Sequence, residues 1–83
     1  MEHQEVLERV IRFLGELPRS QGKTIDGATP LSETVLVDSL TMLQVILFLE
    51  SEFDLRLERG DLDHIDTPAH IADLVIAQSA RQG

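Results

Sequence analysis

The sequence predicts an all-α fold: a four-helix bundle of three principal helices and one short helix, with a long loop between the first and second helices. Three stretches repeat apolar residues at spacings of three and four, the period of an amphipathic helix. No stretch alternates apolar and polar residues as a half-buried strand does. At 83 residues the chain forms a single domain, residues 1–83, with a core expected over about 4–78 and a frayed tail at 79–83.

The first predicted helix carries one apolar stripe and ends at Gly15 and Pro18. Glutamates gather near its start, which suits the positive end of the helix dipole. Residues 18–37 then form the long loop, in which a short helical turn fits 32–36. Such a loop needs anchors in the core, and its apolar residues Ile25, Leu31, Val35 and Leu36 can supply them.

The second predicted helix, residues 39–53, is apolar on two faces. On a helical wheel the core face comprises Met42, Val45, Ile46, Leu49 and Phe53. A second stripe, rotated by roughly 130°, comprises Leu40, Leu43 and Leu47. A bundle of this size can cover one face fully, so we expect the second to be partly exposed and to serve as a contact surface. The alternative is that a neighbouring helix or loop covers both stripes.

The C-terminal third is predicted to hold a short helix near Asp61–His64 and then the last helix. Thr67 is a good N-cap for that helix, and Pro68 fits its first position. Its apolar stripe comprises Ile71, Leu74 and Val75. The polar cluster Asp61, Asp63, His64 and Asp66 lacks the glycine and terminal glutamate of a calcium-binding EF-hand loop, so it predicts caps and turns and no metal site; His70 is expected at the surface.

The charge and composition narrow the possible partners. A net charge of −8 disfavours nucleic acid and anionic membranes and favours proteins with basic patches. The chain has no cysteine, which excludes disulfides and thiolate catalysis. It lacks the apolar block of a signal peptide and any apolar stretch of transmembrane length, so we expect a cytoplasmic protein without membrane insertion. We also expect a monomer. From Thr24 through Leu55 there is no Lys, Arg or His, while six acids are present: Asp26, Glu33, Asp38, Glu50, Glu52 and Asp54.

Ser39 lies at the predicted start of the second helix, directly after Asp38. Both residue types are preferred helix caps, and capping alone can explain them. A nucleophilic serine would need a base and an orienting group, and the three histidines, His3, His64 and His70, occur in no recognisable triad context. An anion attached to Ser39 would instead lie beside the free N–H groups of a helix start, where negative charge is stabilised. Ser39 is therefore a candidate for receiving a modification.

The stretch from Val37 to Phe53, "VDSLTMLQVILFLESEF", resembles the phosphopantetheine attachment region of acyl and peptidyl carrier proteins. The segment that follows, "FDLRLERGDLDHIDTPAHIADLV", resembles the second loop, short helix and last helix of that family. The resemblance thus covers nearly the whole chain. In the first stretch the matching positions are Asp38, Ser39, Leu40, Glu50, Glu52, Phe53 and, just after it, Asp54.

The resemblance implies that Ser39 is esterified by 4′-phosphopantetheine from coenzyme A, whose thiol carries an acyl or aminoacyl group as a thioester. It implies a protein that is not an enzyme and that is served by a phosphopantetheinyl transferase, an adenylating or ligase enzyme and a downstream acceptor enzyme. Asp38 would flank the attachment site, where the transferase and its metal meet the carrier. The implied docking residues are Leu40, Leu43, Leu47, Glu50, Asp54 and Ile65.

The branch of the family stays open at the level of sequence. Fatty-acid carriers often have a glycine where Leu36 and Val37 stand, and acidic residues where Thr41 and Gln44 stand. The glutamine and the leucine-rich turns after it are closer to discrete aminoacyl carriers, such as the D-alanyl carrier proteins. The alternatives are a polyketide, nonribosomal or fatty-acid type of acyl carrier, and, from another class, an acidic helical module that binds a protein without carrying anything.

Overall fold

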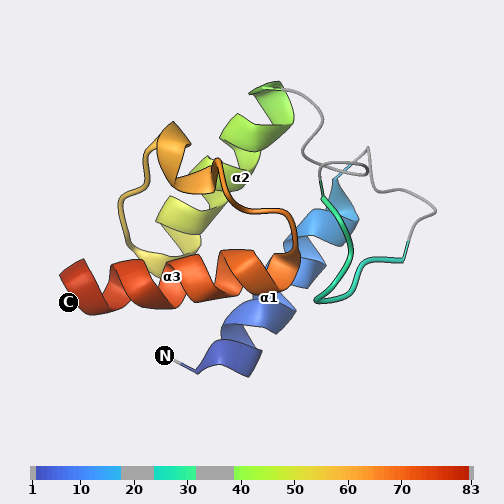
Figure 1. The fold of residues 1–83 in the computed structure, drawn as a ribbon, viewed down its shortest axis with the longest axis horizontal. Coiled ribbons are helices and arrows are strands. Elements are labelled where there is room, and N and C mark those ends of the chain that lie inside the picture. Colours follow the sequence, from blue (N-terminus) through green and yellow to red (C-terminus); the bar gives the residue numbers. More distant parts are fainter. Residues whose placement is uncertain (1, 18–23, 32–38, 83) are drawn as a thin grey trace.

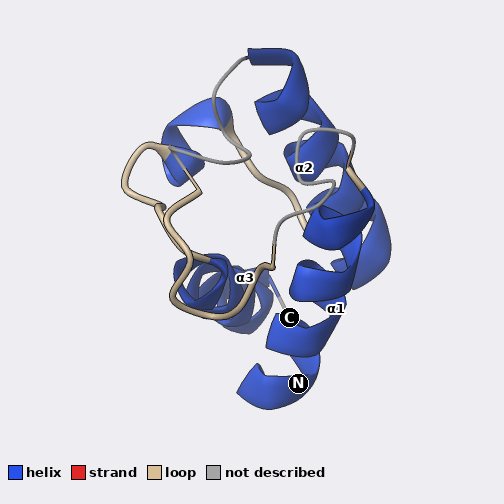
Figure 2. Ribbon diagram, turned by 90° about the vertical axis from the view of Figure 1, so that its right-hand side faces the viewer, coloured by secondary structure: helices blue, strands red, loops and turns tan. Residues whose placement is uncertain are grey.

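The computed structural model describes residues 2–17, 24–31 and 39–82, and these ranges contain helices and loops but no strand. The elements are α1 (His3–Glu16), α2 (Ser39–Phe53), the 3₁₀ helix η2 (Arg59–Leu62) and α3 (Pro68–Gln82). In Figure 1 α3 crosses α1, and Figure 2, which looks along α3, shows α1 and α2 side by side. The three long helices and the short one confirm the predicted all-α class.

The core is largely aliphatic and draws on every described helix. Val6, Val10 and Leu14 of α1 are buried, as the spacing of its stripe predicts. Val45 and Leu49 of α2 meet them from the neighbouring helix, and the predicted face of α3 is likewise buried at Ile71 and Val75. The complete buried apolar set is Val6, Val10, Leu14, Leu17, Leu31, Val45, Ile46, Leu49, Phe53, Leu55, Leu57, Leu62, Ile71, Ala72 and Val75.

The described part of the long loop, residues 24–31, is tied to the start of α3. The backbone N–H of Leu31 donates to the carbonyl of Asp66, and that of Ala69 donates to the carbonyl of Gly27 at 3.1 Å. Leu31 is fully buried and Ile25 is half-buried, so both act as the predicted anchors. The other two predicted anchors, Val35 and Leu36, and the predicted turn at 32–36 lie outside the described residues.

The short helix begins two residues earlier than the sequence predicts, at Arg59 instead of Asp61. The cause is a capping box: Asp61 accepts the backbone N–H of Glu58 at 2.9 Å, and the Glu58 side chain accepts the backbone N–H of Asp61 in return. These reciprocal bonds fix the helix start before Arg59. Asp61 is thus the third residue of the helix and not its beginning.

The last helix starts as predicted and continues past residue 78. Thr67 caps it, because its Oγ1 accepts the backbone N–H of His70 at 3.2 Å, and Pro68 is the first helical residue. Residues 79–82, expected to belong to a frayed tail, continue the helix through Gln82. Arg81 in the last turn suits the negative end of the helix dipole, which favours this extension.

Candidate functional site

The candidate attachment residue, Ser39, is the first residue of α2. Helix α2 therefore begins where the sequence predicts, and its first turn places the backbone N–H groups of a helix start at this position. Asp38, predicted to flank the site, lies outside the described residues. Leu40, the next residue, is 67% exposed, so the described part of the site opens to solvent.

The second stripe of α2 is exposed, as expected. Leu40, Leu43 and Leu47 are 67%, 47% and 56% exposed, and they are the large apolar side chains most open to solvent in the described chain. The alternative in which a neighbouring segment covers both stripes is therefore wrong. Three leucines on one side of a helix form a contiguous apolar strip, and such a strip on a small protein commonly marks a contact surface. We call Leu40, Leu43 and Leu47 the leucine strip.

The acids at the end of α2 differ in what they contact. The half-buried carboxylate of Glu50 accepts the backbone N–H of Leu57 at 2.9 Å, so it holds the chain that returns toward η2. Glu52 pairs with Arg9 of α1 at 3.2 Å in an exposed bridge. Asp54 is exposed. Of the two acids predicted to dock partners, Glu50 thus has a structural contact and Asp54 projects into solvent.

Asp54 also has an unusual backbone. Its φ of 52° places it in the left-handed region, directly after the last residue of α2. The N–H of the next residue, Leu55, donates to the carbonyl of Glu50 at 3.3 Å. This is the six-to-one bond of a Schellman motif, which ends the helix and turns the chain.

Ile65 follows η2 and is half-buried. It lines a shallow depression of about 360 Å³ together with His64, His70, Asp73 and Leu74. Both views place η2 at the same end of the molecule as the start of α2. His70 is exposed, and its Nδ1 accepts the backbone N–H of Asp66 at 3.3 Å, so its observed role is at the helix start.

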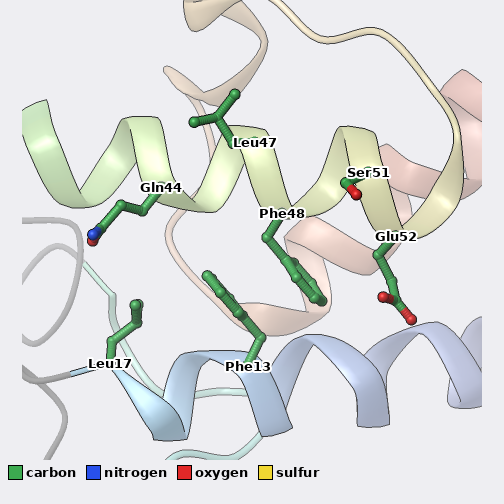
Figure 3. A pocket seen from close by; sticks show the side chains of 7 residues that line it. All are labelled: Phe13, Leu17, Gln44, Leu47, Phe48, Ser51 and Glu52. Carbon is green, nitrogen blue, oxygen red and sulfur yellow. The ribbon is translucent and has the colours of Figure 1, made fainter.

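A groove between α1 and α2 is the feature that the sequence does not reveal. It has a volume of about 450 Å³. Phe13 and Phe48 form its floor, stacked with ring centroids 4.0 Å apart and planes within 6° (Figure 3). Phe53 meets Phe48 edge-on at 6.2 Å. The residues that line the groove are Phe13, Leu17, Gln44, Leu47, Phe48, Ser51 and Glu52.

One sequence signal does point toward this groove. Phe48 lies on the wheel between the core face and the leucine strip, a position that neither stripe explains. A large ring at such a border has to pack against a neighbouring helix or remain exposed. The partner ring, Phe13, lies on a different helix, so the spacing of residues within α2 could not identify it.

No group of three or more His, Cys, Asp or Glu side chains among the described residues is arranged to hold a metal ion. No helix in the described ranges combines the length and the apolar character needed to cross a membrane.

Comparison with known proteins decides the family. Over 81 residues the chain is 30% identical to a protein named acyl carrier protein from Saccharopolyspora erythraea, an alignment that covers 98% of this chain and 85% of the relative. The chain belongs to the acyl carrier protein family. The aligned residues include α1, α2, η2 and α3, so the relationship to the family extends over the whole bundle. No family model and no solved structure matches it.

Proposed function

We propose that this chain tethers an acyl or aminoacyl group as a thioester on a 4′-phosphopantetheine arm at Ser39 and presents that group to partner enzymes. One observation carries the proposal: in a chain of the acyl carrier protein family, α2 begins at Ser39 and an exposed leucine strip begins at the very next residue. An attachment point and a contact surface thus adjoin on one helix.

The start of α2 fits a phosphodiester. The first N–H groups of a helix have no partner within the helix, and they stabilise a negative charge placed beside them. The chain has no cysteine, so a thiol for carrying cargo has to come from outside the sequence. A bound phosphopantetheine arm supplies that thiol, while the bundle fixes the base of the arm on a helix packed into the core.

The leucine strip is the proposed docking surface for the enzymes that modify, load and unload the carrier. Apolar side chains that are already exposed lose water on contact with a partner, which favours binding. The absence of basic residues from Thr24 through Leu55 leaves this part of the chain acidic, and the exposed Asp54 adds to that field. Partners with basic patches are therefore attracted to the same helix. Ile65, beyond η2, is proposed as the outlying member of this surface.

The partners proposed are a phosphopantetheinyl transferase, an adenylating or ligase enzyme that loads the cargo, and a downstream enzyme that accepts it. The carrier itself lowers no barrier. It raises the local concentration of a tethered group around each enzyme in turn. We propose that it acts as a cytoplasmic monomer, with Asp38 beside the site where the transferase works.

The attachment site can be tested by intact mass. The apo protein is incubated with coenzyme A, Mg²⁺ and a broad-specificity phosphopantetheinyl transferase. Wild type is expected to gain the mass of one phosphopantetheine, and Ser39→Ala is expected to gain nothing. Ser51→Ala is a matched control, because Ser51 is an exposed serine on the same helix.

Two results would contradict the proposal. If wild type gains no mass, the chain is an acidic helical module that binds partners without carrying cargo. If Ser39→Ala is still modified, the attachment residue lies elsewhere in the chain.

A further inference from the structure

Glu50 binds the chain that leaves α2 through two hydrogen bonds. Its backbone carbonyl accepts the N–H of Leu55 at 3.3 Å, and its Oε2 atom accepts the N–H of Leu57 at 2.9 Å. Glu50 is half-buried, and Leu55 and Leu57 are both buried. One residue near the end of the helix therefore holds two alternate amides of the segment that follows, one through its backbone and one through its side chain.

The amide held by the side chain lies shortly before η2. Glu58, the residue after Leu57, caps η2 through its reciprocal bonds with Asp61. At the other end of η2 the carbonyl of the buried Leu62 accepts the N–H of Ile65 at 3.1 Å. Because these contacts follow one another with few residues between them, the position of Leu57 determines where η2 begins and where Ile65 lies.

Burial alone does not fix this position. Leu55 and Leu57 keep the segment against the core, but apolar contacts are non-directional and tolerate sliding of the chain. A hydrogen bond depends on both distance and angle, so it selects one backbone N–H for the end of α2. The carboxylate accepts that N–H in a charge-assisted bond, which is stronger than a bond between neutral groups. Without this bond we expect η2 to shift while the bundle remains folded.

We propose that Glu50 is a positioning residue of the docking surface: its carboxylate holds η2 and Ile65 in place relative to the leucine strip, without contacting partner enzymes itself. The inference rests on the proposed function, because it concerns the surface that would present the group carried at Ser39. Figures 1 and 2 show η2 at the end of the molecule where α2 begins, so a shift of η2 changes the outline of that end. The surface that partners meet is therefore set partly by a residue in the last turn of α2.

The proposal separates two acids near the end of α2 by mechanism. One carboxylate oxygen of the half-buried Glu50 is occupied by the loop, which restricts the approach of a basic side chain from a partner. Asp54 is exposed and can attract such a side chain through its charge. Charge effects between exposed groups weaken as salt rises, whereas the effect of a displaced helix does not. Salt dependence therefore distinguishes a positioning residue from a charge contact.

Three substitutions of Glu50 separate geometry from charge. Glu50→Gln removes the charge but keeps an oxygen at the same reach, because the amide oxygen of glutamine also accepts an N–H. Glu50→Asp keeps the charge but shortens the side chain, and Glu50→Ala removes both properties. Glu52→Gln is the matched control for lost charge, because Glu52 is an exposed acid of the same helix that pairs with Arg9 and not with the loop.

The substrate in the test is the apo form of the full chain. A broad-specificity phosphopantetheinyl transferase modifies it with coenzyme A, and initial rates over a range of chain concentrations give KM and kcat. Glu50→Ala and Glu50→Asp are expected to raise KM about fivefold with kcat nearly unchanged, the pattern of lost binding that is equal in the ground and transition states. The increase should be the same at about 0.05 M and about 0.3 M salt. Glu50→Gln and Glu52→Gln should remain within about twofold of wild type.

Amide NMR spectra report the position of η2 independently. The signals of Asp61 and Ile65 are expected to shift in Glu50→Ala and Glu50→Asp, and to stay close to those of wild type in Glu50→Gln. The signal of Val10, buried in α1, should stay unchanged in all variants and show that the bundle is folded. A merely structural role would lower stability without raising KM, so the two measurements together identify positioning.

The outcomes that overturn the inference are distinct. If Glu50→Gln raises KM as much as Glu50→Ala does, or if the increase in Glu50→Ala disappears at the higher salt concentration, Glu50 acts as a charge contact. If KM is unchanged in Glu50→Ala and Glu50→Asp, Glu50 does not position the docking surface, whether or not the signals of η2 move. If Glu50→Ala fails to fold, the comparison of Glu50→Gln with Glu50→Asp decides. If wild type itself gains no phosphopantetheine, the proposed function fails, which is a different result from an unchanged KM in modified chains.

Discussion

The two sides of α2 carry the same kind of residue in opposite environments. Leu49 on one side is fully buried, whereas Leu47, two residues earlier, is 56% exposed. Leucine on the first side stabilises the bundle, and leucine on the second contributes little to folding and is available for contact. The comparison shows that apolar character alone does not separate core from surface in this helix. The angular position of each residue around the helix axis does.

The largest expected effect comes from truncating a leucine on the buried side of α2. Leu49→Ala removes a side chain with no solvent exposure and is expected to lower the free energy of unfolding by about 3 kcal/mol. Leu47→Ala is the control on the other side and is expected to change it by less than about 0.5 kcal/mol. Urea denaturation followed by circular dichroism measures both. Equal losses in the two variants would mean that α2 does not have one structural face and one contact face.

The same comparison shows what could be predicted from sequence. The bounds of α2 and the division of its leucines follow from a period of 3.6 residues, which requires no knowledge of neighbouring helices. The cap at Thr67 and the first helical position of Pro68 follow from local backbone chemistry in the same way. Such features depend on residues within one or two turns of each other.

Features that depend on distant segments were not predictable. The groove exists because Phe13 and Phe48 come together from two helices, and periodicity within a helix does not fix how helices approach. The structural contact of Glu50 arises because the chain returns past it at Leu57. In the sequence Glu50 was one of several acids after the leucines. Its different role becomes visible only when the path of the loop is known.

The next largest effect compares two acids of α2, as the substitutions of Leu49 and Leu47 compare two of its leucines. Glu50→Ala leaves the backbone N–H of Leu57 without its carboxylate partner and is expected to cost about 1.5 kcal/mol of stability. Glu52→Ala breaks an exposed pair with Arg9, and such pairs contribute about 0–1 kcal/mol. Thermal melts of the two variants give the ranking. A larger loss for Glu52→Ala would show that Glu50 does not hold the returning chain.

A charge on the leucine strip tests the contact side directly. Leu43→Glu is expected to slow transfer of cargo to a partner enzyme about tenfold, equal to about 1.4 kcal/mol, because it places a carboxylate where a partner would bury an apolar side chain. Its melting temperature should remain close to that of wild type. Ala77→Glu, at an exposed position on α3, is the matched control and should leave transfer unchanged. A large drop in melting temperature for Leu43→Glu would instead place Leu43 in the core.

The smallest expected effect concerns Asp54, whose left-handed backbone conformation ends α2. A residue with a Cβ is strained there and glycine is not, so Asp54→Gly is expected to raise stability by about 0.5 kcal/mol after its greater loss of chain entropy is included. Asp54→Ala keeps the Cβ and is expected to be less stable than Asp54→Gly in the same denaturation experiment. Both variants remove the same carboxylate. If the two variants slow transfer equally, the docking effect is therefore due to the lost charge. If the less stable variant slows transfer more, the effect is due to the end of the helix.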